Sequence, residues 1–376
     1  MLDATEGASP TAPSASTSVF VATFASLLAL IFGFLFLDVA LARVDRNEST
    51  MHAAHLYQEG KALLAAGDPH EASDRFASAL AIEHTNITYA LGLAQSMMDA
   101  GRSDDAEQTL VSALDRAAND GAVNLLMARL LERTGRPGEA TVYYHRAIFG
   151  RWGADSTQRK TGTRFELVES LARRKDGGAM LAELLPLQAT LPDSPAIRRR
   201  LAHLFLQAGS PRRAMDILRD FIRRDPKDAD AYAGMAEAAL ALGNFATAQA
   251  DFAQAAILQP NNAVIASRQA LADTVLILDP QARRLNEGER SIRAQALLAR
   301  AVAERERCLG ASYTGPLADS ARSHMVPLPA SPTATPERTD AMTELAASIA
   351  STRPPKCAAS FAPDEVLFTV MRSLEP

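Results

Sequence analysis

A turn-forming residue recurs through the middle of the chain at a fixed spacing. The six turn positions are Gly67, Gly101, Gly135, Lys175, Gly209 and Gly243. The first three are 34 residues apart, and so are the last three. The middle step is 40 residues, as if six residues, 155–160, were inserted. A constant period of this length is typical of a repeat array, in which each unit buries its apolar face against its neighbours.

The residues around each turn predict pairs of helices. A small residue stands five positions after most of the turns, and a large apolar residue stands nine positions after each one. The large residues are Phe76, Leu110, Tyr144, Leu184, Leu218 and Phe252. Apolar positions spaced by three and four fit a helix and not a strand. Proline and small polar residues just after the turns, as in Gly209-Ser210-Pro211, are typical of a helix start.

These residues resemble the signature of tetratricopeptide repeat (TPR) proteins. The segment 229–262 carries that signature as Tyr232, Ala236, Gly243, Ala248, Phe252, Ala255 and Pro260. The resemblance implies an all-α, right-handed α-solenoid of six to seven helical hairpins. The six repeats are expected at 53–86, 87–120, 121–154, 161–194, 195–228 and 229–262, followed by a seventh helix pair or cap at 263–309. The fourth repeat departs most, because Lys175 and Met180 replace the usual glycine and alanine.

The resemblance also implies a concave groove, lined by the first helix of each repeat, that binds peptide segments. The matching positions are Tyr57, Lys61, Leu91, Gln95, Leu125, Arg129, Arg133, Phe165, Arg173, Arg199 and His203. Basic residues stand beside apolar ones in this set, so one hypothesis is that the groove binds a peptide with acidic residues around an apolar anchor. The alternative is that the arginines are ordinary solvated surface. The family's clamp for a C-terminal carboxylate is not matched at Tyr57 and Lys61.

An uncharged apolar run from Val19 to Leu37 precedes the repeats. At 1.5 Å per residue it would form a helix of about 28 Å, close to the thickness of the hydrocarbon layer. We therefore predict a transmembrane helix at 19–42 in contact with the lipid bilayer, after a disordered tail at 1–18 and before a linker at 43–52. The run is expected to be retained as an anchor, although Ala40-Leu41-Ala42 resembles a cleavage site.

The orientation of this anchor rests on few charges. Arg43 and Arg46 follow the run and no basic residue precedes it, so the positive-inside rule favours repeats on the cytoplasmic side of a cell (inner) membrane. A periplasmic orientation stays open. Arginine far outnumbers lysine and alanine is abundant, which is typical of a GC-rich bacterial genome.

The last part of the chain, 310–376, is rich in proline, serine and alanine and is predicted to be mostly disordered. A short helix at 364–374 has an apolar face, and it either docks on the solenoid or a partner or stays unfolded. Cys308 and Cys357 stand 49 residues apart, and a disulfide framework is not expected from two such cysteines.

No motif for catalysis, for a cofactor or for a metal stands out. The seven histidines are scattered, and the net charge of −5 does not favour nucleic acid as a partner. We therefore expect no enzyme and no cofactor, but a membrane-anchored, single-pass scaffold that binds a protein partner through its concave groove. The alternative is a periplasm-facing accessory of an envelope-assembly, secretion or polysaccharide-export machine.

Overall fold

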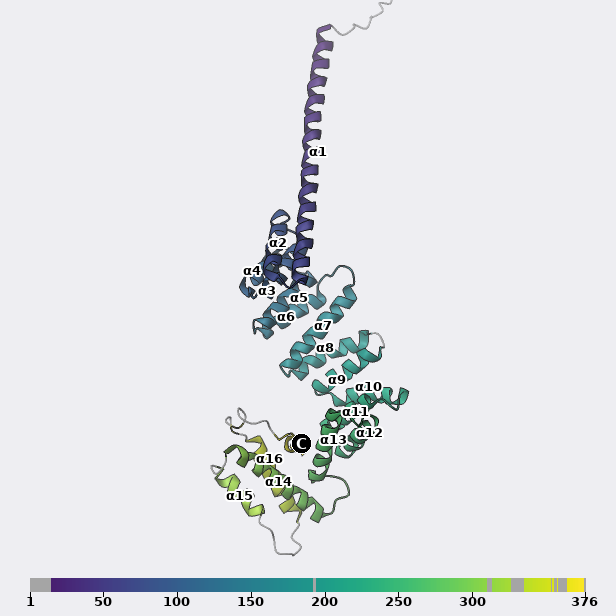
Figure 1. Ribbon diagram of the computed structural model, residues 1–376, viewed down its shortest axis with the longest axis vertical. Coiled ribbons are helices and arrows are strands. Elements are labelled where there is room, and N and C mark those ends of the chain that lie inside the picture. Colours follow the sequence, from purple (N-terminus) through teal and green to yellow (C-terminus); the bar gives the residue numbers. More distant parts are fainter. Residues whose placement is uncertain are drawn as a thin grey trace, which may run out of the picture. The chain divides into compact units, whose positions relative to one another are not determined.

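The computed structural model describes residues 15–191, 194–309, 313–325, 335–352, 354, 357 and 364–374, with 15–22 described by their backbone alone. All regular elements in these residues are α-helices (Figure 1). They are α1 (Ala15–Ala65), α2 (Pro69–Ile82), α3 (Ile87–Asp99), α4 (Ser103–Arg116), α5 (Gly121–Arg133), α6 (Pro137–Phe149), α7 (Ser156–Arg173), α8 (Gly177–Thr190), α9 (Pro195–Gln207), α10 (Pro211–Arg224), α11 (Ala229–Ala241), α12 (Phe245–Leu258), α13 (Ala263–Leu278), α14 (Glu287–Leu309), α15 (Pro316–Met325), α16 (Pro336–Ser351) and α18 (Glu365–Leu374). The chain divides into two compact units, residues 1–167 and 168–376.

The first helix is longer than predicted. Helix α1 runs for 51 residues without a break, and the predicted polar linker at 43–52 is part of this helix (Figure 1). The segment lacks both glycine and proline, and nothing in it stops a helix that continues into the buried residues Ala53 and Leu56. The predicted tail at 1–18 is helical from Ala15, and residues 1–14 lie outside the described part.

The six predicted turn positions all adopt the left-handed backbone conformation. The φ angles of the five glycines lie between 70° and 85°, and Lys175 has a φ of 58°. At the end of α3 the amide of Gly101 donates to the carbonyl of Met98, and the amide of Arg102 donates to that of Met97. This pair of hydrogen bonds is the Schellman motif, which ends a helix with a residue of positive φ. The residues that recur every 34 positions therefore mark the C-terminal end of the first helix in each hairpin.

In the unit 1–167, an aromatic side chain fills the space between neighbouring hairpins. Phe76 from α2 is 1% exposed, and its ring centroid lies 5.4 Å from that of Tyr57 on α1. A Cβ atom added at Gly60 or Gly92 would lie 2.8 Å from the Phe76 ring. The repeat therefore needs a residue without a side chain on each helix that flanks this ring.

The six inserted residues lengthen one helix. Helix α7 has 18 residues whereas α5 has 13, and Asp155, with a φ of 60°, stands directly before it. Ahead of the insertion, Trp152 donates a hydrogen bond of 2.8 Å from its indole Nε1 to the carbonyl of Ala147. A Cβ atom at Gly121 would lie 2.2 Å from this indole, so the indole and the start of α5 are in close contact.

In the unit 168–376, the predicted disorder after residue 310 is wrong for the part that the structure describes. Helices α15, α16 and α18 pack with α11 to α14 around one apolar core. On α16, Met342, Ala346, Ile349 and Ala350 are all buried, at the spacing of three and four that a core-facing helix requires. Because proline and serine dominate the composition of the chain after residue 310, the sequence-based prediction missed this short apolar pattern. The predicted helix at 364–374 docks as α18.

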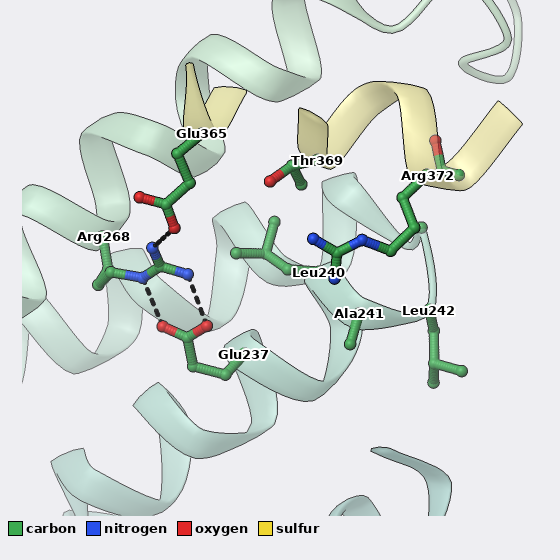
Figure 2. Close-up of a pocket in the computed structure, with 10 residues that line it drawn as sticks. Glu237, Leu240, Ala241, Leu242, Arg268, Glu365, Thr369 and Arg372 are labelled. Carbon is green, nitrogen blue, oxygen red and sulfur yellow. Dashed lines mark hydrogen bonds and ion pairs between the residues drawn. The ribbon is translucent and has the colours of Figure 1, made fainter. Parts of the chain in front are cut away.

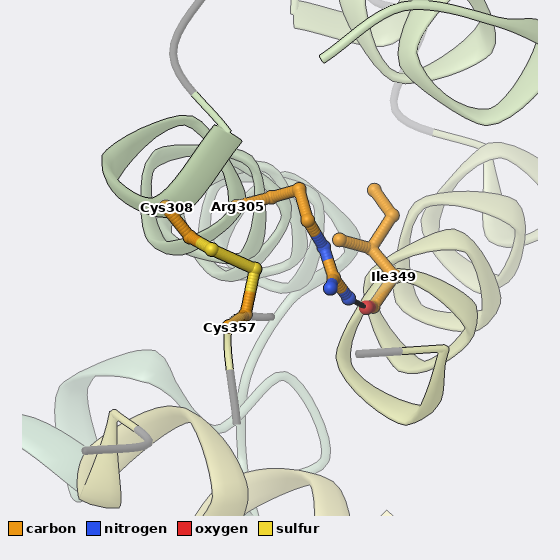
Figure 3. Close-up of a disulfide and its surroundings, with 4 residues drawn as sticks. All are labelled: Arg305, Cys308, Ile349 and Cys357. Atoms are coloured by element: carbon orange, nitrogen blue, oxygen red, sulfur yellow. Dashed lines mark hydrogen bonds between the residues drawn. A yellow bond between two sulfur atoms is a disulfide. The ribbon is translucent and has the colours of Figure 1, made fainter. Parts of the chain in front are cut away.

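The two cysteines form a disulfide, contrary to the sequence-based prediction (Figure 3). Cys308 lies near the end of α14, and the Cα atoms of Cys308 and Cys357 are 5.6 Å apart. The C-terminal ends of α14 and α16 meet beside it, where the buried guanidinium of Arg305 donates a hydrogen bond to the carbonyl of Ile349. Packing of helices far apart in the sequence brings the thiols together, and the separation of 49 residues carries no sign of it.

Candidate functional site: the inner helices of the repeats

Within each unit, first helices of neighbouring hairpins contact one another. In the unit 1–167 these contacts join α1 to α3 and α3 to α5, and in the unit 168–376 they join α9 to α11. The groove residues predicted from the family resemblance stand on these inner helices and on α7. The inner helices therefore carry the candidate binding surface within each unit.

In the unit 1–167, carboxylates pair with two of the three predicted basic residues. Arg129 donates from Nε and Nη2 to Glu166, over distances of 2.9 and 2.6 Å. These hydrogen bonds raise the pKa of Arg129. Arg133 donates to Asp99 at 2.9 Å, and the Lys61 ammonium lies 5.8 Å from the centroid of the Tyr57 ring. Two of the three predicted basic residues of this unit, Arg129 and Arg133, thus form ion pairs between repeats.

The predicted apolar groove residues of this unit are largely covered. Phe165 is 8% exposed, and Tyr57, Leu91 and Leu125 are half-buried. Burial raises the pKa of the Tyr57 phenol. Gln95 donates a hydrogen bond of 2.8 Å to Asp99, so its amide belongs to the same polar series. These side chains support the packing of the inner helices more than they offer a free apolar surface.

In the unit 168–376, Arg199 on α9 is paired as well. Its guanidinium donates to Asp228 at 2.6 and 3.1 Å and lies 4.9 Å from the ring centroid of Phe221. The Asp228 carboxylate is buried, so this pair holds the start of α11 against α9. His203, one turn further on, lies 3.0 Å from the Gln207 side-chain nitrogen. Arg173 is exposed at the end of α7.

A pocket of about 300 Å³ opens on the inner helices α9, α11 and α13. Its apolar wall includes Leu206, Phe252 and Val264, and the last of these is 71% exposed. The charged or polar residues of its lining are Arg199, His203, Asp230, Glu237 and Arg268. Of all these residues, only Arg199 and His203 were among the predicted candidates. Glu237 follows His203 by 34 residues, so the repeat period itself marks its position.

A second pocket, of about 420 Å³, lies between α11, α13 and α18 and shares Glu237 and Arg268 with the first. Figure 2 shows the Arg268 guanidinium between the carboxylates of Glu237 and Glu365. These hydrogen bonds raise the pKa of Arg268, with the bonds to Glu237 as the larger cause. The arginine therefore separates two pockets and stays charged at any physiological pH.

Helical hairpins with left-handed turns at a regular spacing, stacked through their inner helices, define an α-solenoid. Residues 63–130 and 205–272 match the family model of the tetratricopeptide repeat. The chain therefore carries tetratricopeptide repeats in these two segments. Repeats of this family are generally scaffolds for protein–protein interaction.

Solved structures of similar proteins are distant in sequence. PilW, described as a widely conserved type IV pilus biogenesis factor, is 22% identical, with a TM-score of 0.39, and covers 57% of this chain and 97% of its own. Pseudomonas aeruginosa pilF is 17% identical, with a TM-score of 0.41 and coverage of 60% and 99%. The C-terminal part of a TPR protein from Cytophaga hutchinsonii is 12% identical, with a TM-score of 0.46 and coverage of 65% and 94%. No curated protein sequence matches the chain.

Proposed function

We propose that this protein is a membrane-anchored scaffold that binds a protein segment along its inner helices. The observation that carries the proposal is the pocket on α9, α11 and α13, because it combines an apolar wall with charged side chains at its rim. An apolar side chain of a partner would be removed from water there, while the rim orients the chain around it.

The charged residues at this rim indicate which side chains of a partner the pocket would bind. Arg199 and Arg268 already bind the carboxylates of Asp228 and Glu237. An acidic residue of a partner would compete with Asp228 at Arg199, whereas Arg268 binds Glu237 and Glu365 at the same time. We infer that an apolar anchor supplies most of the affinity and that polar contacts at the rim supply specificity.

The anchor in this proposal is the first part of α1. From Thr23 onward this helix is long and apolar enough to cross a membrane, and its apolar stretch is not buried against the rest of the protein. Large apolar side chains such as Phe32, Phe34 and Phe36 are 67–75% exposed, which is costly in water. A bilayer would cover them and would raise the local concentration of the scaffold around membrane-bound partners.

The disulfide favours one orientation of the anchored protein. Disulfides persist in oxidising compartments and are rare in the cytosol, where thiols are kept reduced. The bond between Cys308 and Cys357 thus supports the periplasm-facing alternative over the orientation that Arg43 and Arg46 suggest. A reporter that is active only in the periplasm, fused after Pro376, should be active. An inactive reporter in a membrane-bound, folded fusion would contradict this orientation.

Binding at the pocket can be tested with two matched exposed residues. Val264 lines the pocket and is 71% exposed, whereas Ile257 on α12 is 72% exposed and is not part of the lining. We expect Val264→Asp to reduce cross-linked capture of the partner from membranes at least tenfold, because a carboxylate would stand beside the apolar anchor. Ile257→Asp should capture the same amount as the wild type. Equal capture by both variants would contradict binding at this pocket.

A further inference from the structure

Helix α18, far along the chain from the repeats, packs on their inner helices. It contacts α11 and α13, the first helices of their hairpins, and also α14 and α16. Its apolar residues Leu367, Val370 and Met371 are buried in one core with Ala236 and Leu240 of α11. A TPR array offers this surface to protein segments from outside, and here a segment of the same chain covers part of it.

The first turn of α18 is held by two separate ion pairs. Glu365 accepts a hydrogen bond from Arg268, whose other donors bind Glu237 at 2.5 and 2.6 Å. Asp364 accepts a hydrogen bond of 2.9 Å from Arg300 on α14. The Asp364 carboxylate also caps the helix, since it accepts from the amide of Leu367 at 3.0 Å. Acidic residues at a helix start are favoured by the helix dipole, so these contacts stabilise α18 in its place.

The far end of α18 reaches the turn between α11 and α12. A Cβ atom added at Gly243 would lie 3.0 Å from the Cβ atom of Ser373. Between the two ends, Thr369 and Arg372 line the pocket of about 420 Å³ (Figure 2). Helix α18 therefore spans the inner surface from Arg268 to the hairpin turn, and the other pocket, beside Arg199, stays open.

The disulfide keeps α18 close to this surface. Cys357 is seven residues before Asp364 in the chain and is bonded to Cys308 on α14 (Figure 3). A segment tethered over so few residues has a high effective concentration at its site. An external ligand that binds the surface covered by α18 must compete with this tethered helix. A ligand that binds the open pocket beside Arg199 need not.

We propose that α18 is a built-in ligand of the inner surface and that it occupies an amphipathic-helix site. A competing partner would be a helix with an acidic residue in its first turn and apolar residues two, five and six positions later, the spacing of Leu367, Val370 and Met371 from Glu365. The inference rests on the proposed binding role of the inner helices. Its test uses the α18 peptide, so it can fail while the partner still binds beside Val264.

The first experiment measures binding of the α18 sequence in trans. A fluorescent peptide of residues 364–374 is titrated into the full-length protein in detergent, as wild type and as the variant Leu367→Asp with Met371→Asp, which releases α18. We expect the peptide to bind the variant at least tenfold more tightly than the wild type. Equal binding to both proteins, or no binding to a variant with wild-type helicity and cooperative melting, would overturn the proposal.

The second experiment leaves the buried residues of α18 intact. Glu365→Arg in the full-length protein should speed hydrogen exchange of the α18 amides about tenfold, because two guanidinium groups would face each other. Adding Arg268→Glu should restore the slow exchange. Glu344→Arg, a charge reversal at an exposed site on α16, is the control and should change nothing. The proposal fails if Glu365→Arg behaves like this control.

Discussion

At the scale of single residues, Lys175 occupies a turn position that glycine holds in five other hairpins. Its amide donates to the carbonyl of Ala172, and the next amide donates to that of Leu171, which repeats the hydrogen bonds at Gly101. The backbone conformation is therefore imposed by the hairpin and not chosen by the side chain. A residue with a Cβ atom pays about 1 kcal/mol or more for this conformation.

We predict that Lys175→Gly raises the free energy of unfolding by about 1 kcal/mol, because it removes this strain at a φ of 58°. Gly101→Ala should lower it by a similar amount, since its φ is 78° and no atom lies near the added Cβ. Urea unfolding followed by circular dichroism measures both changes. If both variants were less stable than the wild type, the hairpin would not impose the same turn at Lys175.

For the arginines of the inner helices, the prediction from single residues did not include their ion-pair partners. Arg133 was predicted as part of a basic groove, although its partner Asp99 precedes it by 34 residues, at the same position of the previous repeat. That spacing was available in the sequence and indicates the pair. Arg129 and Glu166 are 37 residues apart across the insertion, so no period indicates their contact. Whether a charge is free or paired depends on the neighbouring repeat.

At the scale of secondary-structure elements, the hairpins were predictable because each one repeats the same local signals. Of the C-terminal helices only α18 was predicted, as a helix that either docks or stays unfolded, because ten-residue helices such as α15 and α18 gain their stability from packing. Helix α16 begins with Thr335 as its cap and Pro336 in its first turn, which are ordinary start signals. The surrounding proline-rich composition outweighed them in the sequence-based prediction.

The disulfide should matter most for these C-terminal helices. We predict that Cys308→Ser with Cys357→Ser lowers their free energy of unfolding by about 2–4 kcal/mol, because the bond closes a loop of roughly 50 residues in the unfolded chain. Hydrogen exchange resolved by peptide should show the loss in α16 and α18, with α3 to α5 unchanged as the internal control. Uniform exchange rates in both proteins would show that the bond does not stabilise this region.

At the scale of the whole molecule, the proposed role depends on the apolar part of α1. We predict that Phe32→Arg with Phe36→Arg moves the protein to the soluble fraction, because each arginine at the centre of a span costs about 2.5–3.5 kcal/mol. Carbonate extraction of membranes measures this distribution. The control, Val44→Arg with Met51→Arg, changes exposed residues of the same helix beyond the predicted span and should stay in the membrane. A wild-type protein that is soluble without detergent would refute the anchor.

The sequence by itself determined the all-α repeat architecture, the places of the hairpin turns and the apolar start of α1. It could do so because each of these depends on residues close together in the chain or separated by one constant period. Only the tertiary structure decided that Arg129 pairs with Glu166, that Cys308 bonds to Cys357, and that α18 covers the inner face of α11 and α13. Those contacts join residues far apart in the sequence, such as Arg268 and Glu365 at a separation of 97 positions, and only the packing of the helices brings them together.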